Sequence, residues 1–354
     1  MGVRRVALCG YYGRGNFGDD LMAVIFGRAI QRLGAELRVY KLCEAYAGRF
    51  GFEVAQTPET LLDGADLLVW GGGSSLIPWR GFIYRKLHPK AILGNIAVML
   101  EAERRGVRLA ALSVGGDGNP APPDPRERRA KLLSLASRMT VRNQADLALP
   151  QRAGVRCEWF PDIVWHTGAM FPFTRSSSRG RLRIGIDMYP SNLLRQHGEY
   201  FVALLQMAVM RRPDIEFVLI DSANRTRSPY RGLGLAVRGR NVTRYQFEHL
   251  EPDLEMLVGL DALVSTRLHV PIVCMQYGVP VASVLGEGKT RLLFESLGLS
   301  EHFYRHSRMA EWTKVMLARQ GWERWIEGYR FPPVEDLRQG CQGHLRVLAE
   351  EVAR

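Results

Sequence analysis

The chain has 354 residues, 46% of them hydrophobic and 24% charged, with a formal net charge of +12. This composition is that of a globular protein of about two domains and argues against intrinsic disorder. Because there is no signal-peptide pattern and no apolar run of roughly 18 residues, we expect a cytoplasmic protein, with the inner face of the membrane as an alternative location. The basic balance favours anionic partners such as phosphorylated metabolites.

Short β-branched runs alternate with amphipathic segments along the first half of the chain. We expect helices at residues 21–33 and 131–136. We expect strands at residues 5–8, 37–41, 66–70, 108–113, 139–142 and 157–160.

The second half repeats the alternation and ends in an amphipathic helix. Strands are expected at residues 182–186, 216–220, 241–245, 262–266 and 279–284. Two series of alternating strands and helices predict an α/β protein with two Rossmann-like, doubly wound domains. A Ser/Gly/Arg-rich segment at residues 174–181 is typical of a linker. The predicted domains are therefore residues 1–173 and 182–333, followed by a C-terminal helix at residues 334–354.

Arg267 and His269 interrupt an apolar run between a buried strand and a helix that we expect to begin at Pro271. In open α/β sheets, ligands bind at the carboxyl ends of the strands, where a helix N-terminus offers N–H groups to an anion. If the loop is extended, the side chains of Arg267 and His269 point the same way and Leu268 turns into the core. The stretch predicts an anion site with a titratable partner; a local cap and an ordinary ion pair are the alternative.

Two further cations follow strands. Arg142 ends the strand at residues 139–142, and its planar guanidinium suits a carboxylate or a phosphate. Lys289 lies in a strand-to-helix loop at the same sheet edge as His269. The surrounding LGEGKT is not a P-loop, because the first glycine of that motif would fall at Ser283.

A glycine-rich loop, GYYGRGNFGDD at residues 10–20, follows the first strand and satisfies the G-x-G-x-x-G spacing. Asp19 and Asp20 would nevertheless repel a pyrophosphate at the helix N-terminus, which argues against dinucleotide binding. They could instead accept hydrogen bonds from sugar hydroxyls or cap the helix. A second loop, WGGGSSL at residues 70–76, can bring backbone N–H groups close to a ligand.

Other patterns argue against metal and nucleic-acid sites. Five scattered cysteines without a CxxC pair predict neither a disulfide framework nor a zinc site. The chain has no HExxH, no GxSxG and no carboxylate cluster with metal-ligand spacing, so we expect no metal. A nucleic-acid-binding module would also explain the positive charge, but no recognised binding motif supports it. We therefore expect no nucleic-acid partner.

The glycine-rich loops, Val141-Arg142-Asn143, and above all Ser265-Thr-Arg-Leu-His269 followed by Gly278-Val-Pro280 and Lys289 resemble the polysaccharide pyruvyl transferase family. The resemblance covers about the first 300 residues, and the Arg-Leu-His block with the downstream Gly-Val-Pro is its most specific part. It implies a fold similar to that of GT-B glycosyltransferases, with two domains facing across a cleft. It also implies transfer of pyruvate from phosphoenolpyruvate to a sugar of a cell-envelope or exopolysaccharide precursor, with ketal formation and release of phosphate.

The family's residue roles carry over by position. Arg142, Arg267 and Lys289 would bind phosphoenolpyruvate, and His269 with Arg267 would be catalytic. The resemblance implies an acceptor side formed by Gly15, Asn16, Asp19, Asp20, Gly72, Gly73 and Ser74. Phosphoenolpyruvate is a co-substrate and no other cofactor is implied. The acceptor class includes sugar nucleotides, lipid-linked sugars and oligosaccharides; peripheral membrane contact and the oligomeric state stay open.

Three positions depart from the family pattern. Asp187-Met188-Tyr189 stands where many members carry an arginine, which removes one candidate cation. The segment after Ser74 lacks an acidic residue often found there, and Asp146 stands where a serine is usual. We therefore expect the acceptor side to differ more than the donor side. The alternative function is a nucleotide-sugar glycosyltransferase of the same architecture.

Overall fold

The computed structural model describes residues 5–77, 89–119, 123, 128–175, 180–188, 192–222, 237–318 and 320–354. The chain forms two compact units, the first Met1–His166 with Glu335–Arg354 and the second Thr167–Val334. The predicted boundaries therefore need two corrections: residues 167–173 belong to the second unit, and the C-terminal helix belongs to the first. Residues 167–173 join the second unit because Gly168 N donates to Gln276 Oε1 at 2.9 Å and Tyr277 Oη donates to Phe171 O at 2.7 Å.

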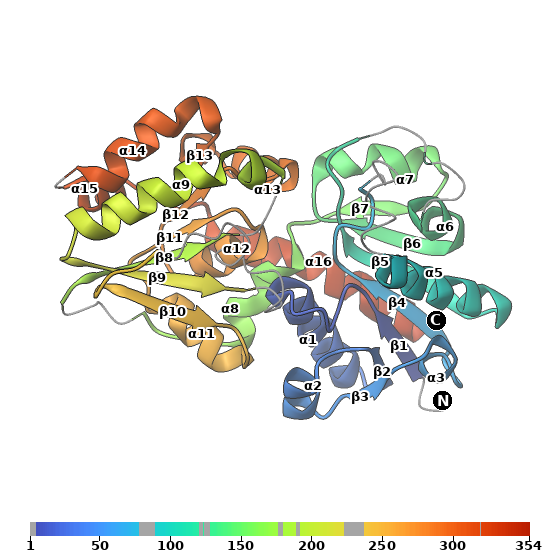
Figure 1. The fold of residues 1–354 in the computed structure, drawn as a ribbon. Coiled ribbons are helices and arrows are strands. Elements are labelled where there is room, and N and C mark those ends of the chain that lie inside the picture. The colour runs from blue at the N-terminus through green and yellow to red at the C-terminus, as the bar shows by residue number, and fades with distance from the viewer. Residues whose placement is uncertain are drawn as a thin grey trace. The chain divides into compact units, whose positions relative to one another are not determined.

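The first unit is built on a parallel sheet with the strand order β3-β2-β1-β4-β5-β6-β7 (Figure 1). Its strands are β1 (Arg5–Cys9), β2 (Glu36–Tyr40), β3 (Glu53–Ala55), β4 (Leu67–Gly71), β5 (Arg108–Val114), β6 (Ala136–Val141) and β7 (Cys157–Trp159). Its α-helices are α1 (Phe17–Arg32), α2 (Glu44–Phe50), α3 (Pro58–Leu61), α5 (Pro89–Arg104), α6 (Arg128–Leu135), α7 (Ala148–Arg152) and α16 (Val334–Ala353). Two 3-10 helices are η1 (Gln144–Asp146) and η2 (Ile163–His166).

The strands of the first unit are buried on both faces, as parallel strands between helices are. One face packs against α3, α5, α6 and α7 through a core that includes Trp70, Met99 and Met139. Side chains alternate along a strand, so Arg138 and Thr140, the neighbours of Met139, lie on the opposite face. That second face is the one that α16 covers, as the bond of Thr140 to His344 shows.

The second unit holds a parallel sheet with the order β10-β9-β8-β11-β12-β13 (Figure 1). Its strands are β8 (Leu182–Asp187), β9 (Ile215–Asp221), β10 (Val242–Gln246), β11 (Ala262–Ser265), β12 (Val281–Val284) and β13 (Phe303–Tyr304). Its α-helices are α8 (Thr167–Met170), α9 (Asn192–Arg211), α11 (Leu250–Val258), α12 (His269–Gln276), α13 (Gly288–Ser296), α14 (Met309–Leu317) and α15 (Gly321–Glu327). The 3-10 helices are η4 (Ser300–His302) and η5 (His306–Arg308). One sheet face packs against α9, α14 and α15 through a core that includes Phe217, Trp312 and Trp322.

The predicted fold class is confirmed, and every predicted strand overlaps a strand of the structure. The prediction missed β3 and β13, because these edge strands of three and two residues are too short to show a periodic pattern. The helix expected at residues 131–136 ends at Leu135, and Ala136 already begins β6. All five cysteines are free thiols. Within the described ranges, none of the helices combines the length and apolarity that crossing a membrane requires.

Candidate active site

Each sheet has one point at which the strand order reverses, between β1 and β4 in the first unit and between β8 and β11 in the second. Connections leave such a point toward opposite faces, and ligands of open α/β sheets bind in the crevice at the carboxyl ends of those strands. The two glycine-rich loops follow β1 and β4, while Arg267 and His269 follow β11. The structure thus brings each set of predicted residues to a switch point of its own sheet.

Arg267 is held in place at both its backbone and its side chain. Its guanidinium Nη1 donates to the carbonyl of Ser222 at 2.6 Å and to the hydroxyl of Ser222 at 2.8 Å. Its backbone N–H donates to Ser265 Oγ at 2.9 Å. Ser222 follows β9 and Ser265 ends β11, so residues at the carboxyl ends of two strands of the sheet hold Arg267.

Asp187, the last residue of β8, connects the two serines. Its Oδ1 accepts a hydrogen bond from Ser222 Oγ at 2.5 Å and its Oδ2 accepts one from Ser265 Oγ at 2.9 Å. The side chain is buried, and burial raises the pKa of its carboxyl, against the opposing effects of Arg267 and the two hydroxyls.

In the sequence pattern Asp187 indicated only the loss of a cation, and neither its contacts nor Ser222 were predicted. Both positions lie at the carboxyl end of a strand, and that location was the available signal. Tyr189, the third residue of the departing segment, lies outside the described residues.

His269 is the first residue of α12. The helix starts two residues before Pro271, where the sequence placed its start, and the loop is not extended, because Leu268 already has a helical backbone, with φ −94° and ψ −52°. Pro271 fits the first helical turn because N–H groups there have no partner within the helix. Leu268 is buried as expected, and His269 is 8% exposed. The side-chain directions of Arg267 and His269 are therefore not related by the alternation of an extended strand.

Lys289 lies in the first turn of α13, directly after the loop from β12. Its Nζ is 3.4 Å from Glu287 Oε2, and its side chain is 25% exposed. The hydroxyl of the next residue, Thr290, donates to the carbonyl of Thr266 at 3.5 Å. Since β11 pairs with β12, the N-terminal turn of α13 lies beside the end of the strand that precedes Arg267.

Arg142 directly follows β6 and is buried. Its Nη1 donates to Asp162 Oδ2 at 3.2 Å, and its Nη2 donates to Ser74 Oγ at 3.3 Å. Arg142, predicted to bind phosphoenolpyruvate, and Ser74, predicted to bind the acceptor, are thus neighbours in the first unit. Asp162 was missed by the sequence analysis, although it too follows a strand, β7, at the same sheet edge.

The loop after β4 requires glycine. Gly72 and Gly73 have φ of +79° and +81°, in the left-handed region that glycine adopts without steric cost. Gly73 O accepts from Gly115 N at 3.0 Å, and Leu76 N donates to Gly115 O at 3.0 Å. The glycine loops after β4 and β5 are therefore joined beside Arg142.

Asp146, at the position where the family pattern has a serine, organises the loop after β5. Its carboxylate accepts the N–H of Gly116 at 2.7 Å, the N–H of Gly118 at 3.0 Å and the amide of Asn143 at 3.0 Å. A serine side chain has one oxygen and could not accept all three bonds in this way. This departure from the pattern thus has a structural role.

The two aspartates of the first glycine-rich loop bind within the loop itself. Asp20 is 3% exposed, and its Oδ1 accepts the N–H of Gly13 at 2.6 Å. Burial raises the pKa of Asp20 to about 8; the charge of Asp19 acts in the same direction, and the Gly13 bond opposes both. Asp19 accepts a hydrogen bond from the amide of Asn16. The Gly13 N–H is therefore already used, which agrees with the argument against a bound pyrophosphate.

The predicted acceptor residues thus differ in accessibility. Gly15 is exposed and Asn16 and Ser74 are half-buried, whereas Asp19, Asp20, Gly72 and Gly73 are buried. Tyr12 Oη donates to Gly71 O at 2.5 Å and ties the first loop to the end of β4. Among the described residues, no group of three or more His, Cys, Asp and Glu side chains is arranged to hold a metal ion.

The sequence motifs and the geometry agree with a comparison of the whole sequence. A family model described as polysaccharide pyruvyl transferase matches residues 16–286. The chain belongs to the polysaccharide pyruvyl transferase family. The matched range includes Arg142, Arg267 and His269, and Lys289 lies just beyond its end. Among curated protein sequences, none matches this chain.

The fold of this pyruvyl transferase family member is similar to that of several solved structures. The UDP-GlcNAc 2-epimerase of Methanocaldococcus jannaschii, in complex with UDP-GlcNAc and UDP, is similar with a TM-score of 0.64 and 9% identity, over 98% of this chain and 100% of that one. The UDP-GlcNAc 2-epimerase of Neisseria meningitidis, bound to UDP-GlcNAc, gives 0.60 and 10%, over 99% and 100%. A glycotransferase of kitacinnamycin gives 0.53 and 13%, over 100% and 99%. At these identities the likeness establishes the fold alone, which is the GT-B fold of two Rossmann-like domains.

Proposed function

We propose that this protein transfers pyruvate from phosphoenolpyruvate to a sugar of a cell-envelope or exopolysaccharide precursor, forming a ketal and releasing phosphate. The observation that carries the proposal is the Arg267 guanidinium, fixed by Ser222 immediately before a helix that begins at His269. Family membership supports pyruvyl transfer as the reaction type.

The reaction needs a proton donor and acceptor and fixed positive charge. Protonation of the methylene carbon of phosphoenolpyruvate makes its central carbon electrophilic, and a sugar hydroxyl adds there. A second hydroxyl then attacks the same carbon, and the carbon–oxygen bond to phosphate breaks. Of the two protons that the sugar hydroxyls lose, one replaces the proton that was added to the methylene carbon and the other leaves with the phosphate. The sum is a sugar diol and phosphoenolpyruvate converted to a ketal and phosphate, without an oxidant or reductant.

We assign the proton transfers to His269, because its position opens α12 beside the fixed cation and general acid–base catalysis is worth typically ~10²–10⁴-fold. Arg267 is assigned to the anionic donor, since a guanidinium pairs bidentately with a carboxylate or phosphate. Lys289, on the neighbouring helix N-terminus, is assigned to the departing phosphate. Arg142 is assigned to the donor from its place in the family pattern.

The acceptor is proposed to be a sugar nucleotide, a lipid-linked sugar or an oligosaccharide. Support comes from the family's polysaccharide substrates and from the fold shared with the two epimerases that bind UDP-GlcNAc. Gly15, Asn16 and Ser74 are the accessible members of the predicted acceptor set and are assigned to it.

The decisive experiment incubates the purified full-length chain with phosphoenolpyruvate and a panel of the three acceptor classes. We expect release of inorganic phosphate together with a product heavier than the acceptor by pyruvate less one water, as measured by mass spectrometry. A parallel panel of sugar nucleotides without phosphoenolpyruvate tests the glycosyltransferase alternative. Release of nucleotide in that panel, with no consumption of phosphoenolpyruvate in the first, would overturn the proposal.

A further inference from the structure

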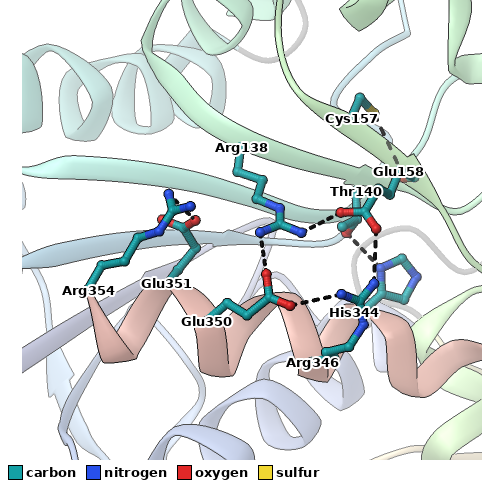
Figure 2. A network of polar contacts seen from close by, with 9 residues as sticks. All are labelled: Arg138, Thr140, Cys157, Glu158, His344, Arg346, Glu350, Glu351 and Arg354. Carbon is teal, nitrogen blue, oxygen red and sulfur yellow. Dashed lines mark hydrogen bonds and ion pairs between the residues drawn. The ribbon is translucent and has the colours of Figure 1, made fainter.

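The C-terminal helix α16 is bound to the sheet of the first unit by a network of ion pairs (Figure 2). Arg138 of β6 is fully buried and pairs with Glu350 of α16 and Glu158 of β7. Arg346 of α16 donates to Glu158 at 2.9 Å and to Glu350 at 2.8 Å. The four charges form a closed ring, which fixes the helix across two neighbouring strands.

His344 lies beside this ring and is fully buried. Its Nε2 is 2.9 Å from Pro161 O, and its Nδ1 is 2.7 Å from Thr140 Oγ1. A carbonyl only accepts, so Nε2 carries the proton and Nδ1 accepts from the Thr140 hydroxyl. Thr140 Oγ1 in turn accepts from Ser113 N at 2.9 Å. Burial lowers the pKa of His344 to about 4, which agrees with this neutral form.

Two glycines allow α16 to approach the segment that follows β7. A Cβ atom at Gly343 would lie 2.2 Å from Phe160 Cδ1, and one at Gly340 would lie 3.1 Å from the ring of Pro161. Glycine is unfavourable inside a helix, so its presence at both contact positions indicates a requirement for close approach. The Phe160 ring also meets His344 edge-on, at 5.3 Å between ring centroids.

The segment contacted by α16 carries the carboxylate that pairs with Arg142. Asp162 follows Pro161 directly, and its Oδ2 accepts from Arg142 Nη1 at 3.2 Å. Its Oδ1 accepts from Val164 N at 3.0 Å, so the carboxylate belongs to a turn that the backbone also closes. The path from His344 to Arg142 therefore runs through one peptide carbonyl and the adjacent side chain.

We propose that His344 is a positioning residue for Arg142, acting through the hydrogen bond that places Pro161 and hence the carboxylate of Asp162. This inference rests on the proposed function in one respect, the binding of phosphoenolpyruvate by Arg142. The C-terminal helix then has a role in the donor site. His344 acts there indirectly, because its hydrogen-bond partners are Pro161 and Thr140 and not Arg142.

A pair of matched variants in the full-length chain separates the two hydrogen bonds of His344. In His344→Gln the side-chain amide nitrogen reaches the place of Nε2 and can still donate to Pro161 O. In His344→Asn the amide reaches only the place of Nδ1, so the bond toward Thr140 can persist while the bond to Pro161 is lost. We expect the KM for phosphoenolpyruvate to rise about tenfold or more in His344→Asn and to stay within about threefold of wild type in His344→Gln. Arg346→Gln, which disturbs the ion pairs but not the Pro161 bond, should leave this KM unchanged.

Hydrogen–deuterium exchange gives a second measurement that does not depend on the substrate. The amides of residues 162–164 should exchange faster in His344→Asn than in His344→Gln, because the turn that carries Asp162 is released only in the former. Equal exchange and equal KM in the two variants would overturn the inference, since a merely structural histidine would tolerate both to the same degree. If wild-type protein does not consume phosphoenolpyruvate, the proposed function fails, and the exchange difference alone decides the positioning role.

Discussion

Asp187 reaches Arg267 through the hydroxyl of Ser222. That hydroxyl accepts from the guanidinium at 2.8 Å and donates to the carboxylate at 2.5 Å. A hydroxyl has one hydrogen, so donation to the Asp187 carboxyl leaves the lone pairs of the Ser222 oxygen for Arg267. Asp187 thus makes the Ser222 hydroxyl a good hydrogen-bond acceptor for Arg267, the cation proposed to bind phosphoenolpyruvate.

We expect Asp187→Asn to weaken binding of phosphoenolpyruvate by about tenfold, seen as a rise in KM with a smaller change in kcat. The substituted amide can accept from only one of the two serines through its single oxygen, so either Ser222 or Ser265 must reorient. Steady-state kinetics at varied phosphoenolpyruvate concentration measure the effect.

The matched control is Asp261→Asn, which removes one negative charge at the opposite, amino end of β11. It should leave the KM for phosphoenolpyruvate within about twofold of wild type. A comparable rise in both variants would show that loss of charge, and not orientation of Ser222, is responsible.

His269→Ala should lower kcat by about 10²–10⁴-fold, the usual contribution of a general acid–base group, with little change in the thermal unfolding temperature. His249→Ala provides the control, because His249 is an exposed histidine at the N-cap of α11 in the same unit. Its activity should match wild type. Full pyruvyl transfer by His269→Ala would contradict the assigned mechanism.

The pKa of Asp20, raised by burial to about 8, predicts a specific pH dependence of stability. The unfolded value is near 4, so between about pH 4 and pH 8 the folded protein holds a proton that the unfolded chain releases. The contribution of Asp20 to the free energy of unfolding therefore falls as the pH rises through this window.

Asp20→Asn removes this titration and keeps an oxygen that can accept the Gly13 N–H. The unfolding temperature of the variant minus that of wild type should increase by several degrees from pH 5 to pH 8. Thermal melts across that range measure this difference. A difference between the two proteins that stays constant with pH would refute the prediction.

Gly343→Ala should destabilise the protein by about 1–3 kcal/mol, because the added methyl group would overlap the Phe160 ring. In a helix without such a neighbour, the same substitution is favourable. Gly48 of α2 has no atom within 4 Å of the position of an added Cβ, and Gly48→Ala should stabilise by about 0.5–1 kcal/mol. Urea unfolding of the two variants tests the pair, and an equal sign of the two changes would contradict the assigned contact.

Much of the fold followed from local patterns. Strands such as residues 66–70 and 108–113 are apolar runs between turn residues, and burial on both faces of a parallel sheet produces that pattern wherever it occurs. The positions of Arg142 and Arg267 after strands followed as well, because the end of a parallel strand determines the sheet edge. The start of α12 could not be predicted in this way, since an apolar residue such as Leu268 fits the buried pattern equally well with an extended or a helical backbone.

Periodicity over a few residues was therefore enough to predict the α/β class, the two sheets and the strand ends at which the proposed site residues stand. The side chains that hold the cations and the docking of the last helix depend on contacts between distant parts of the chain. Ser222 and Arg267 are 45 positions apart, and Thr140 and His344 are 204 positions apart. An amphipathic pattern indicates that one face of a helix is buried, but it does not indicate which strand that face packs against. The docking of α16 depends on the close approach to Phe160 and Pro161 that Gly343 and Gly340 permit. It also depends on the Pro161 carbonyl and the Thr140 hydroxyl, which only the folded chain brings to His344.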